Sequence, residues 1–207
     1  MNPGVRMVTG ADGRRWLFDP GSLCLELLLT GGPAGFAEGE SLRSPADFVR
    51  WLAASRLARV SAIDPRDVTV RPSELRRVKE LRELAWRVMS TLARHEAPRP
   101  EQLEAINDYA REAVHLEVDP HTLELRWAPM SGQQVLGAIA RDAIDVIGVR
   151  ASRVRECLGE DCSLLFLDTS RPGNRRWCSM RRCGNRQKVR AFRERTGSRT
   201  RPSEGSR

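Results

Sequence analysis

Four cysteines in the last quarter of the chain constrain its fold most strongly. They form two pairs, Cys157-x4-Cys162 and Cys178-x4-Cys183, with fifteen residues between the pairs. Close pairs of thiolates joined by a longer arm are typical of tetrahedral zinc, because each short loop supplies two sulfurs. An iron–sulfur cluster and a cysteine cluster without metal are the alternatives. Because four thiolates fill every position of a tetrahedron, we predict one structural Zn²⁺ and no catalytic metal.

Composition indicates a globular cytoplasmic protein. The chain has 207 residues, of which 40% are hydrophobic, enough for a real core. Neither a run of about 18 apolar residues nor a secretory leader is evident, so we expect no membrane segment. Cytoplasmic thiols stay reduced, which favours metal binding over disulfides. The fifth cysteine, Cys24, lies in the apolar run 23–29 and is expected to be an inert core residue.

The net charge of +8 is concentrated at the C-terminal end. Residues 150–207 hold 16 basic and 6 acidic side chains, whereas residues 1–149 hold 19 and 21. Of the 35 basic residues 33 are arginine, as expected of a GC-rich genome, but that bias does not explain their clustering. A basic end on a near-neutral body favours a polyanionic partner, with nucleic acid ahead of a membrane surface.

Residues 1–150 are expected to form a mostly helical N-terminal domain with a small sheet, which makes the fold class α+β. Capping residues and apolar side chains spaced three or four apart predict four helices. These begin near Ser44, Pro72, Glu101 and Ser131. Residues 14–30 suggest two strands joined by a turn, and segments 114–118 and 123–127 suggest a hairpin that returns to the sheet.

The C-terminal part is expected to form a treble-clef-like four-cysteine zinc finger over residues 151–197, followed by a disordered basic tail at 198–207. Gly159 permits the turn of the first cysteine loop. Segments 163–168 and 175–178 are predicted to pair as a hairpin, and a helix is predicted from Gly184 to Thr196. Trp177, Val189 and Phe192 are assigned to the small apolar core of the finger, and a stacking platform for bases is the alternative role.

The segment Cys183-Gly184-Asn185-Arg186 resembles the motif that names the bacterial CGNR zinc-finger family. The segments 165–170, 175–178 and 188–190 are also similar to that family, and the resemblance covers about residues 153–196. Residues 23–150 more weakly resemble the ABATE domain that precedes this finger in stress-induced transcription regulators. The family's Asp-x-x-Asn-Thr run corresponds here to Glu26-Leu-Leu-Leu29-Thr30, so the acid is longer and the amide is absent.

Basic side chains of the finger are the candidate nucleic-acid contacts. Arg186, Arg190 and Arg193 recur at i, i+4 and i+7, which places them on one helix face. The full predicted set is Arg171, Arg175, Arg176, Arg186, Lys188, Arg190 and Arg193. Guanidinium groups suit bidentate phosphate contacts. Neutralisation of the −2 charge of zinc with four thiolates is the alternative role, and it applies best to Arg186 beside a ligand.

The leading interpretation is a DNA-binding transcription regulator whose finger contacts phosphates while the N-terminal domain senses a signal or dimerises. DNA is preferred to RNA because the family resemblance implies it. The alternative is a zinc-stabilised adaptor whose arginines dock an acidic protein partner or RNA. An enzyme is not expected, because His95, His115 and His121 lack a Cys or Ser partner pattern and metal-ligand spacing.

Overall fold

The computed structural model describes residues 2–10, 12–31 and 39–197. The helices are α1 (Leu23–Leu28), α2 (Pro45–Ala53), α3 (Pro72–Ala93), α4 (Pro100–Tyr109), α5 (Gly132–Arg150) and α6 (Asn185–Gly197). The strands are β1 (Arg6–Thr9), β2 (Arg15–Phe18), β3 (Val68–Thr69), β4 (Leu116–Val118), β5 (Leu125–Trp127), β6 (Met130–Ser131), β7 (Val154–Glu156) and β8 (Leu165–Leu167). Three 3-10 segments (Arg56–Arg59, Pro65–Asp67 and Ala151–Arg153) and a π-helical turn (Met180–Gly184) complete the elements. The predicted tail at 198–207 lies outside the described residues.

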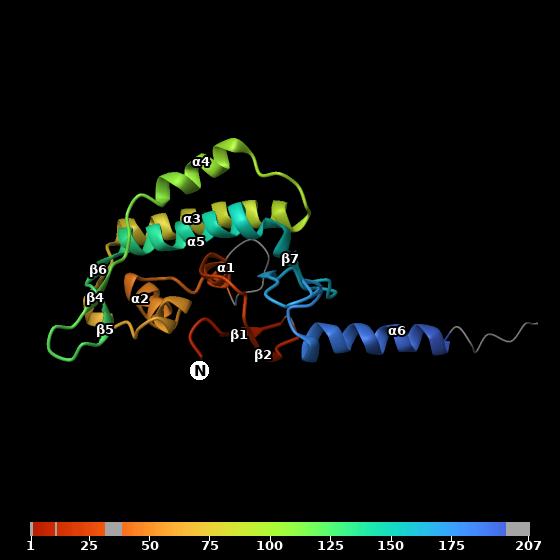
Figure 1. The fold of residues 1–207 in the computed structure, drawn as a ribbon. Helices are drawn as coiled ribbons and strands as arrows, with labels where there is room; N and C mark the ends of the chain where they lie inside the picture. The colour runs from red at the N-terminus through yellow and green to blue at the C-terminus, as the bar shows by residue number, and fades with distance from the viewer. Residues whose placement is uncertain (1, 11, 32–38, 198–207) are drawn as a thin grey trace, which may run out of the picture.

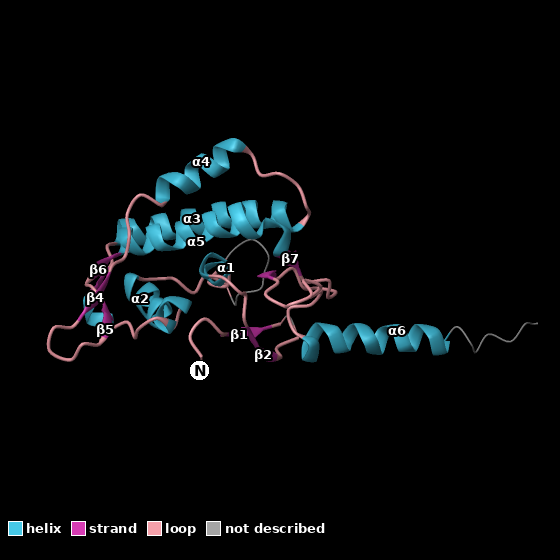
Figure 2. Cartoon of the chain, viewed as in Figure 1, coloured by secondary structure: helices cyan, strands magenta, loops and turns pink. Residues whose placement is uncertain are grey.

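Helices α3 and α5 pack together in the middle of the molecule, with α4 on one side and α1 and α2 on the other (Figure 1). Strands β4 to β6 lie at one end of this helical layer, and β7 lies at the opposite end (Figure 1). Helix α6 projects outward from the β7 end. Helices dominate and the strands are short (Figure 2), which confirms the α+β class. No helix within the described ranges is both long enough and apolar enough to cross a membrane.

The predicted helix starts are confirmed within one residue, because local capping fixes them. Ser44 and Asp47 form a reciprocal capping box at the start of α2, and Ser131 and Gln134 form another at the start of α5. The apolar stripe of α3 is buried in the core, through Leu75, Val78, Leu81, Leu84, Val88 and Leu92.

The strand expected after residue 22 is wrong, because Leu23–Leu28 forms helix α1. The side chain of Ser22 accepts a hydrogen bond from the backbone N–H of Leu25 and so caps the helix. All six residues of α1 are buried, and a segment buried on every side has no periodicity that separates helix from strand. Cys24 is fully buried, as predicted.

A single small sheet is also not observed, because the strands form four separate pairs. The predicted hairpin is present as antiparallel β4 and β5, with Leu116 opposite Trp127 and Val118 opposite Leu125. It joins no larger sheet, since β3 pairs in parallel with β6 and β1 pairs with β2. The pairing of β7 with β8 belongs to the cysteine-containing end of the chain.

The segment between α4 and β4 passes so close to helix α5 that Gly137 of α5 is a sharp test of this arrangement. A Cβ atom there would overlap the backbone carbonyl oxygen of Glu112, whereas a Cβ at Gly148 of the same helix would have no atom within 4 Å. We expect Gly137→Ala to lower the free energy of unfolding by about 1–3 kcal/mol. Gly148→Ala should raise it by about 0.5–1 kcal/mol, because Ala is the better helix former. Urea denaturation measures both, and an equal response would contradict the close approach.

Candidate metal centre

The four predicted ligands come together at the β7 end of the molecule. The sulfurs of Cys157, Cys162, Cys178 and Cys183 all lie within 4.8 Å of one another. The Cys162–Cys178 sulfur distance is 3.8 Å and the Cys178–Cys183 distance is 3.6 Å. A tetrahedron with Zn–S bonds of about 2.3 Å requires sulfurs about 3.8 Å apart. The cluster therefore fits one structural zinc ion.

The thiols are too close to ionise together without a cation. Hydrogen bonds from Cys162 and Cys178 lower the pKa of Cys157 to about 2. The same contact with Cys157 raises the pKa of Cys162 to about 12, and hydrogen bonding with Cys157 also raises the pKa of Cys178. Burial raises the pKa of Cys183. Four thiolates at these distances repel one another, and a divalent cation at their centre offsets that repulsion.

The first cysteine loop owes its shape to two different residues. The positive φ of 55° belongs to Asp161, not to Gly159, which corrects the predicted role of the glycine. Gly159 is needed for close approach, since a Cβ atom there would lie 2.7 Å from the sulfur of Cys183. Backbone N–H groups of Gly159 and Cys178 donate to the sulfur of Cys157 at 3.4 and 3.2 Å. The bond from Cys178 joins the two cysteine loops, and the bond from Gly159 lies within the first loop.

The hairpin expected between segments 163–168 and 175–178 is not formed. Strand β8 pairs instead with β7, with Val154 opposite Leu167. The buried carboxylate of Asp168 accepts from the backbone N–H groups of Ser170 and Arg175, and it turns the chain away from β8. Although burial opposes ionisation, hydrogen bonds from Ser170 and Arg175 hold the pKa of Asp168 below its ordinary value. The 175–178 segment is bound to the first cysteine loop through Leu158 N–H and Arg176 C=O, 3.0 Å apart.

The core beside the cysteines is completed by the N-terminal hairpin β1–β2. Val8 and Phe18 are buried in one cluster with Cys157, Cys178 and Cys183. Leu164 and Phe166 belong to the same cluster, and Trp16 packs against it. The hairpin lies next to the metal centre in Figure 1, although more than 130 residues separate them in sequence. Sequence reasoning missed this contribution, because nothing local in residues 6–18 pairs them with the cysteines.

The prediction of the finger's apolar core is therefore wrong for Val189 and Phe192 and holds for Trp177. Val189 is 50% exposed and Phe192 is 60% exposed, while Trp177 packs against the cysteine cluster. Helix α6 projects from the molecule and contacts the π-helical turn that precedes it (Figure 2). The buried apolar side chains that the N-terminal hairpin adds to the cysteine cluster are Val8 and Phe18.

Polar contacts hold the hairpin in place at both of its ends. The carboxylate of Asp12 accepts a hydrogen bond of 2.6 Å from the guanidinium of Arg182. That guanidinium lies 4.8 Å from the ring centre of Trp16. At the other end, Arg6 donates to the buried carboxylate of Glu26 at 2.6 Å. Burial raises the pKa of Glu26 even though Arg6 opposes it. Glu26 is the first residue of the run 26–30, which corresponds to the family's Asp-x-x-Asn-Thr motif. In this chain it anchors hairpin β1–β2 through Arg6.

Leu29 stands where that run has asparagine in the family. Its side chain packs against the apolar cluster of the metal centre. Thr30, the next residue, is buried and donates through its hydroxyl to the carbonyl oxygen of Leu27. In this chain the position therefore contributes to packing between helix α1 and the cysteine-containing end.

The predicted nucleic-acid residues fall into two groups. Arg175 is turned inward, donates to the carbonyl oxygens of Trp177 and Cys178, and lies 4.2 Å from the ring centre of Phe166. The other predicted basic residues are exposed, namely Arg171, Arg176, Arg186, Lys188, Arg190 and Arg193. The three histidines, His95, His115 and His121, are exposed and far apart in sequence from the cysteines.

The hairpin contribution predicts that zinc retention depends on Phe18. Phe18→Ala removes a buried ring from the cysteine cluster, and such a truncation costs about 3–5 kcal/mol. We expect this variant to lose zinc at a lower chelator concentration than the wild type. Leu17→Ala is the matched control, because Leu17 is on the same strand and 54% exposed. Equal zinc loss from both variants, followed by a chromogenic chelator, would contradict the assignment.

Comparison with known families agrees with this architecture. Residues 153–196 match the CGNR zinc finger, and residues 21–149 match ABATE, described as "Putative stress-induced transcription regulator". No curated protein matches the chain. Both descriptions concern regulation or metal binding, and neither is that of an enzyme. The chain therefore belongs to the ABATE family and carries a C-terminal CGNR zinc finger with one structural zinc site.

Proposed function

We propose that the chain is a DNA-binding transcription regulator whose zinc finger holds DNA mainly through phosphates. The observation that carries this proposal is the number of exposed basic side chains around a small metal centre. Six of the seven predicted contacts are exposed, and Arg181 adds a further exposed arginine. Arginine clusters bind phosphates through paired N–H donors, and neutralised phosphates release counterions from DNA.

Charge compensation at the metal centre involves two inward-facing arginines. Zinc with four thiolates carries a charge of −2. The thiolates of Cys178 and Cys157 attract the charge of Arg175, and those of Cys183 and Cys162 attract that of Arg182. Both guanidinium groups offset thiolate charge, and Arg182 is in addition paired with Asp12. Arg186, the residue expected to compensate the site, is exposed, so we assign it to the phosphate-binding surface.

The shape of the finger supports contact along an extended polyanion. Helix α6 projects from the body (Figure 1). The i, i+4 and i+7 spacing of Arg186, Arg190 and Arg193 places them along one face of this helix. At 1.5 Å per residue, Arg193 lies about 10 Å beyond Arg186. One DNA strand advances about 3.4 Å per phosphate, so this face spans about three nucleotides.

A second candidate is an adaptor that docks an acidic protein or RNA. Exposed apolar side chains near the arginines favour it, since Leu158, Met180, Val189 and Phe192 are each at least half exposed. Apolar and basic groups together suit a protein surface as well as a nucleic acid. Competition by duplex DNA and the dependence of binding on salt separate the two functions. Sensing or dimerisation remains our proposal for the N-terminal domain.

The DNA-binding proposal predicts a defined response to charge reversal. Wild-type protein should bind duplex DNA with a log–log salt slope of about −4 to −5, as four to six phosphate contacts require. Arg190→Glu combined with Arg193→Glu should weaken binding and flatten the slope, while zinc content stays unchanged. Fluorescence anisotropy at several salt concentrations measures both quantities.

The matched control is Arg76→Glu combined with Arg87→Glu, because both arginines are exposed on α3 of the body and the change in net charge is the same. This control should bind almost as the wild type does. Binding that is indifferent to salt, or equal loss in the two double variants, would contradict phosphate contact by α6 and favour the adaptor.

A further inference from the structure

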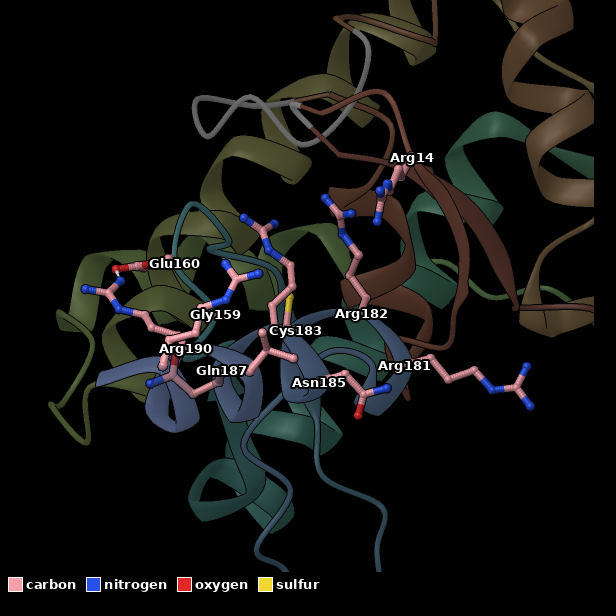
Figure 3. A pocket seen from close by; sticks show the side chains of 12 residues that line it. Arg14, Gly159, Glu160, Arg181, Arg182, Cys183, Asn185, Gln187 and Arg190 are labelled. Atoms are coloured by element: carbon pink, nitrogen blue, oxygen red, sulfur yellow. Dashed lines mark ion pairs between the residues drawn. The ribbon is translucent and has the colours of Figure 1, made fainter. Parts of the chain in front are cut away.

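A pocket of about 480 Å³ opens beside the metal centre and is lined mainly by arginines. Its walls come from the first cysteine loop, the turn after Met180, the start of α6 and the tip of hairpin β1–β2 (Figure 3). The lining arginines are Arg14, Arg181, Arg182, Arg186, Arg190 and Arg193. Arg181 points away from the others in Figure 3, which leaves five guanidinium groups around the hollow.

Arg14 is the unexpected member of this pocket. It follows Asp12 and Gly13 in the turn between β1 and β2, more than 160 residues from the other arginines. The Asp12 carboxylate accepts both the backbone N–H of Arg14 and the guanidinium of Arg182. The turn is therefore tied to the metal centre, and Arg14 is held at the pocket by the same contacts that complete the cysteine core.

Glu160 is the one acidic residue in the described lining, and it forms an ion pair with Arg190 (Figure 3). Both side chains are more than half exposed, so water weakens this pair. Asp12 in turn binds Arg182 from outside the lining. Asp12 and the thiolates offset the charge of Arg182, which leaves four lining guanidinium groups and one lining acid. A concave surface of this charge attracts anions, because the walls focus the positive potential.

We propose that this pocket binds a backbone phosphate of DNA and that Glu160 competes with the phosphate for Arg190. The identity of the partner rests on the proposed function. Arg14 and Arg186 contact the phosphate, and Glu160 moves aside to release Arg190. Arg193 lies further along α6, so a strand anchored in the pocket continues onto the exposed face of the helix. A phosphodiester chain fits this path better than a small anion, which would use the pocket alone.

The first test uses full-length, zinc-loaded protein and duplex DNA. Arg14→Glu should weaken binding about tenfold, as expected when a charge-assisted hydrogen bond is lost, and should reduce the salt slope by about 0.9. Arg15→Glu is the matched control, because Arg15 is the exposed neighbour and does not line the pocket. It should change affinity little. Zinc content must be the same in both variants, which excludes damage to the metal centre.

The second test removes the competing acid. Glu160→Gln should raise DNA affinity about two- to fivefold, the range expected when an exposed ion pair no longer competes. Asp161→Asn is the control, because it changes net charge equally at the next residue and asparagine also tolerates a positive φ. It should raise affinity less than Glu160→Gln does.

The outcomes separate the two proposals. A wild-type protein that does not bind duplex DNA would overturn the proposed function and this inference with it. A wild-type protein that binds DNA, with Arg14→Glu equal to Arg15→Glu and Glu160→Gln equal to Asp161→Asn, would overturn the pocket assignment alone.

Discussion

The packing of hairpin β1–β2 against four clustered cysteine sulfurs is the interaction on which the C-terminal end of the molecule depends. A finger of this size has too few apolar residues for a core of its own, and zinc supplies much of the missing stability. Val8 and Phe18 add buried apolar side chains to the cluster that contains Cys157, Cys178 and Cys183. The same contact brings Arg14 next to α6, so stability and the arginine pocket have one structural cause.

The body and the finger are also joined through a common core. Val154, Leu165 and Leu167 belong to the apolar cluster of the helical body, and β7 packs against α3. Glu26 of α1 accepts a hydrogen bond from Arg6 of β1, while Leu29 packs against the apolar cluster of the metal centre. Hairpin β1–β2 and helix α1 of the N-terminal part thus both contact the cysteine-containing end. The division at residue 150 remains a prediction, and well-packed contacts cross it.

Local sequence signals predicted much of this structure. The features that depend on packing between distant segments could not be predicted from the sequence. The spacing of the cysteines indicated the ligand set, and capping boxes at Ser44 and Ser131 indicated two helices. Helix α1 was mistaken for a strand because a fully buried segment has no polar face to reveal its period. The sequence places Phe192 in the finger core, because no sequence pattern indicates that Phe18 packs in the cysteine cluster.

The central claim is that hairpin β1–β2 and the zinc finger fold as one unit, and backbone hydrogen exchange with and without zinc tests it most directly. Zinc removal should increase exchange in the cysteine-containing segment 154–184 and, equally, in hairpin residues 6–18, while α3 and α5 keep their protection. If residues 6–18 stay protected after zinc is removed, the hairpin is stabilised by the body alone and the account is contradicted.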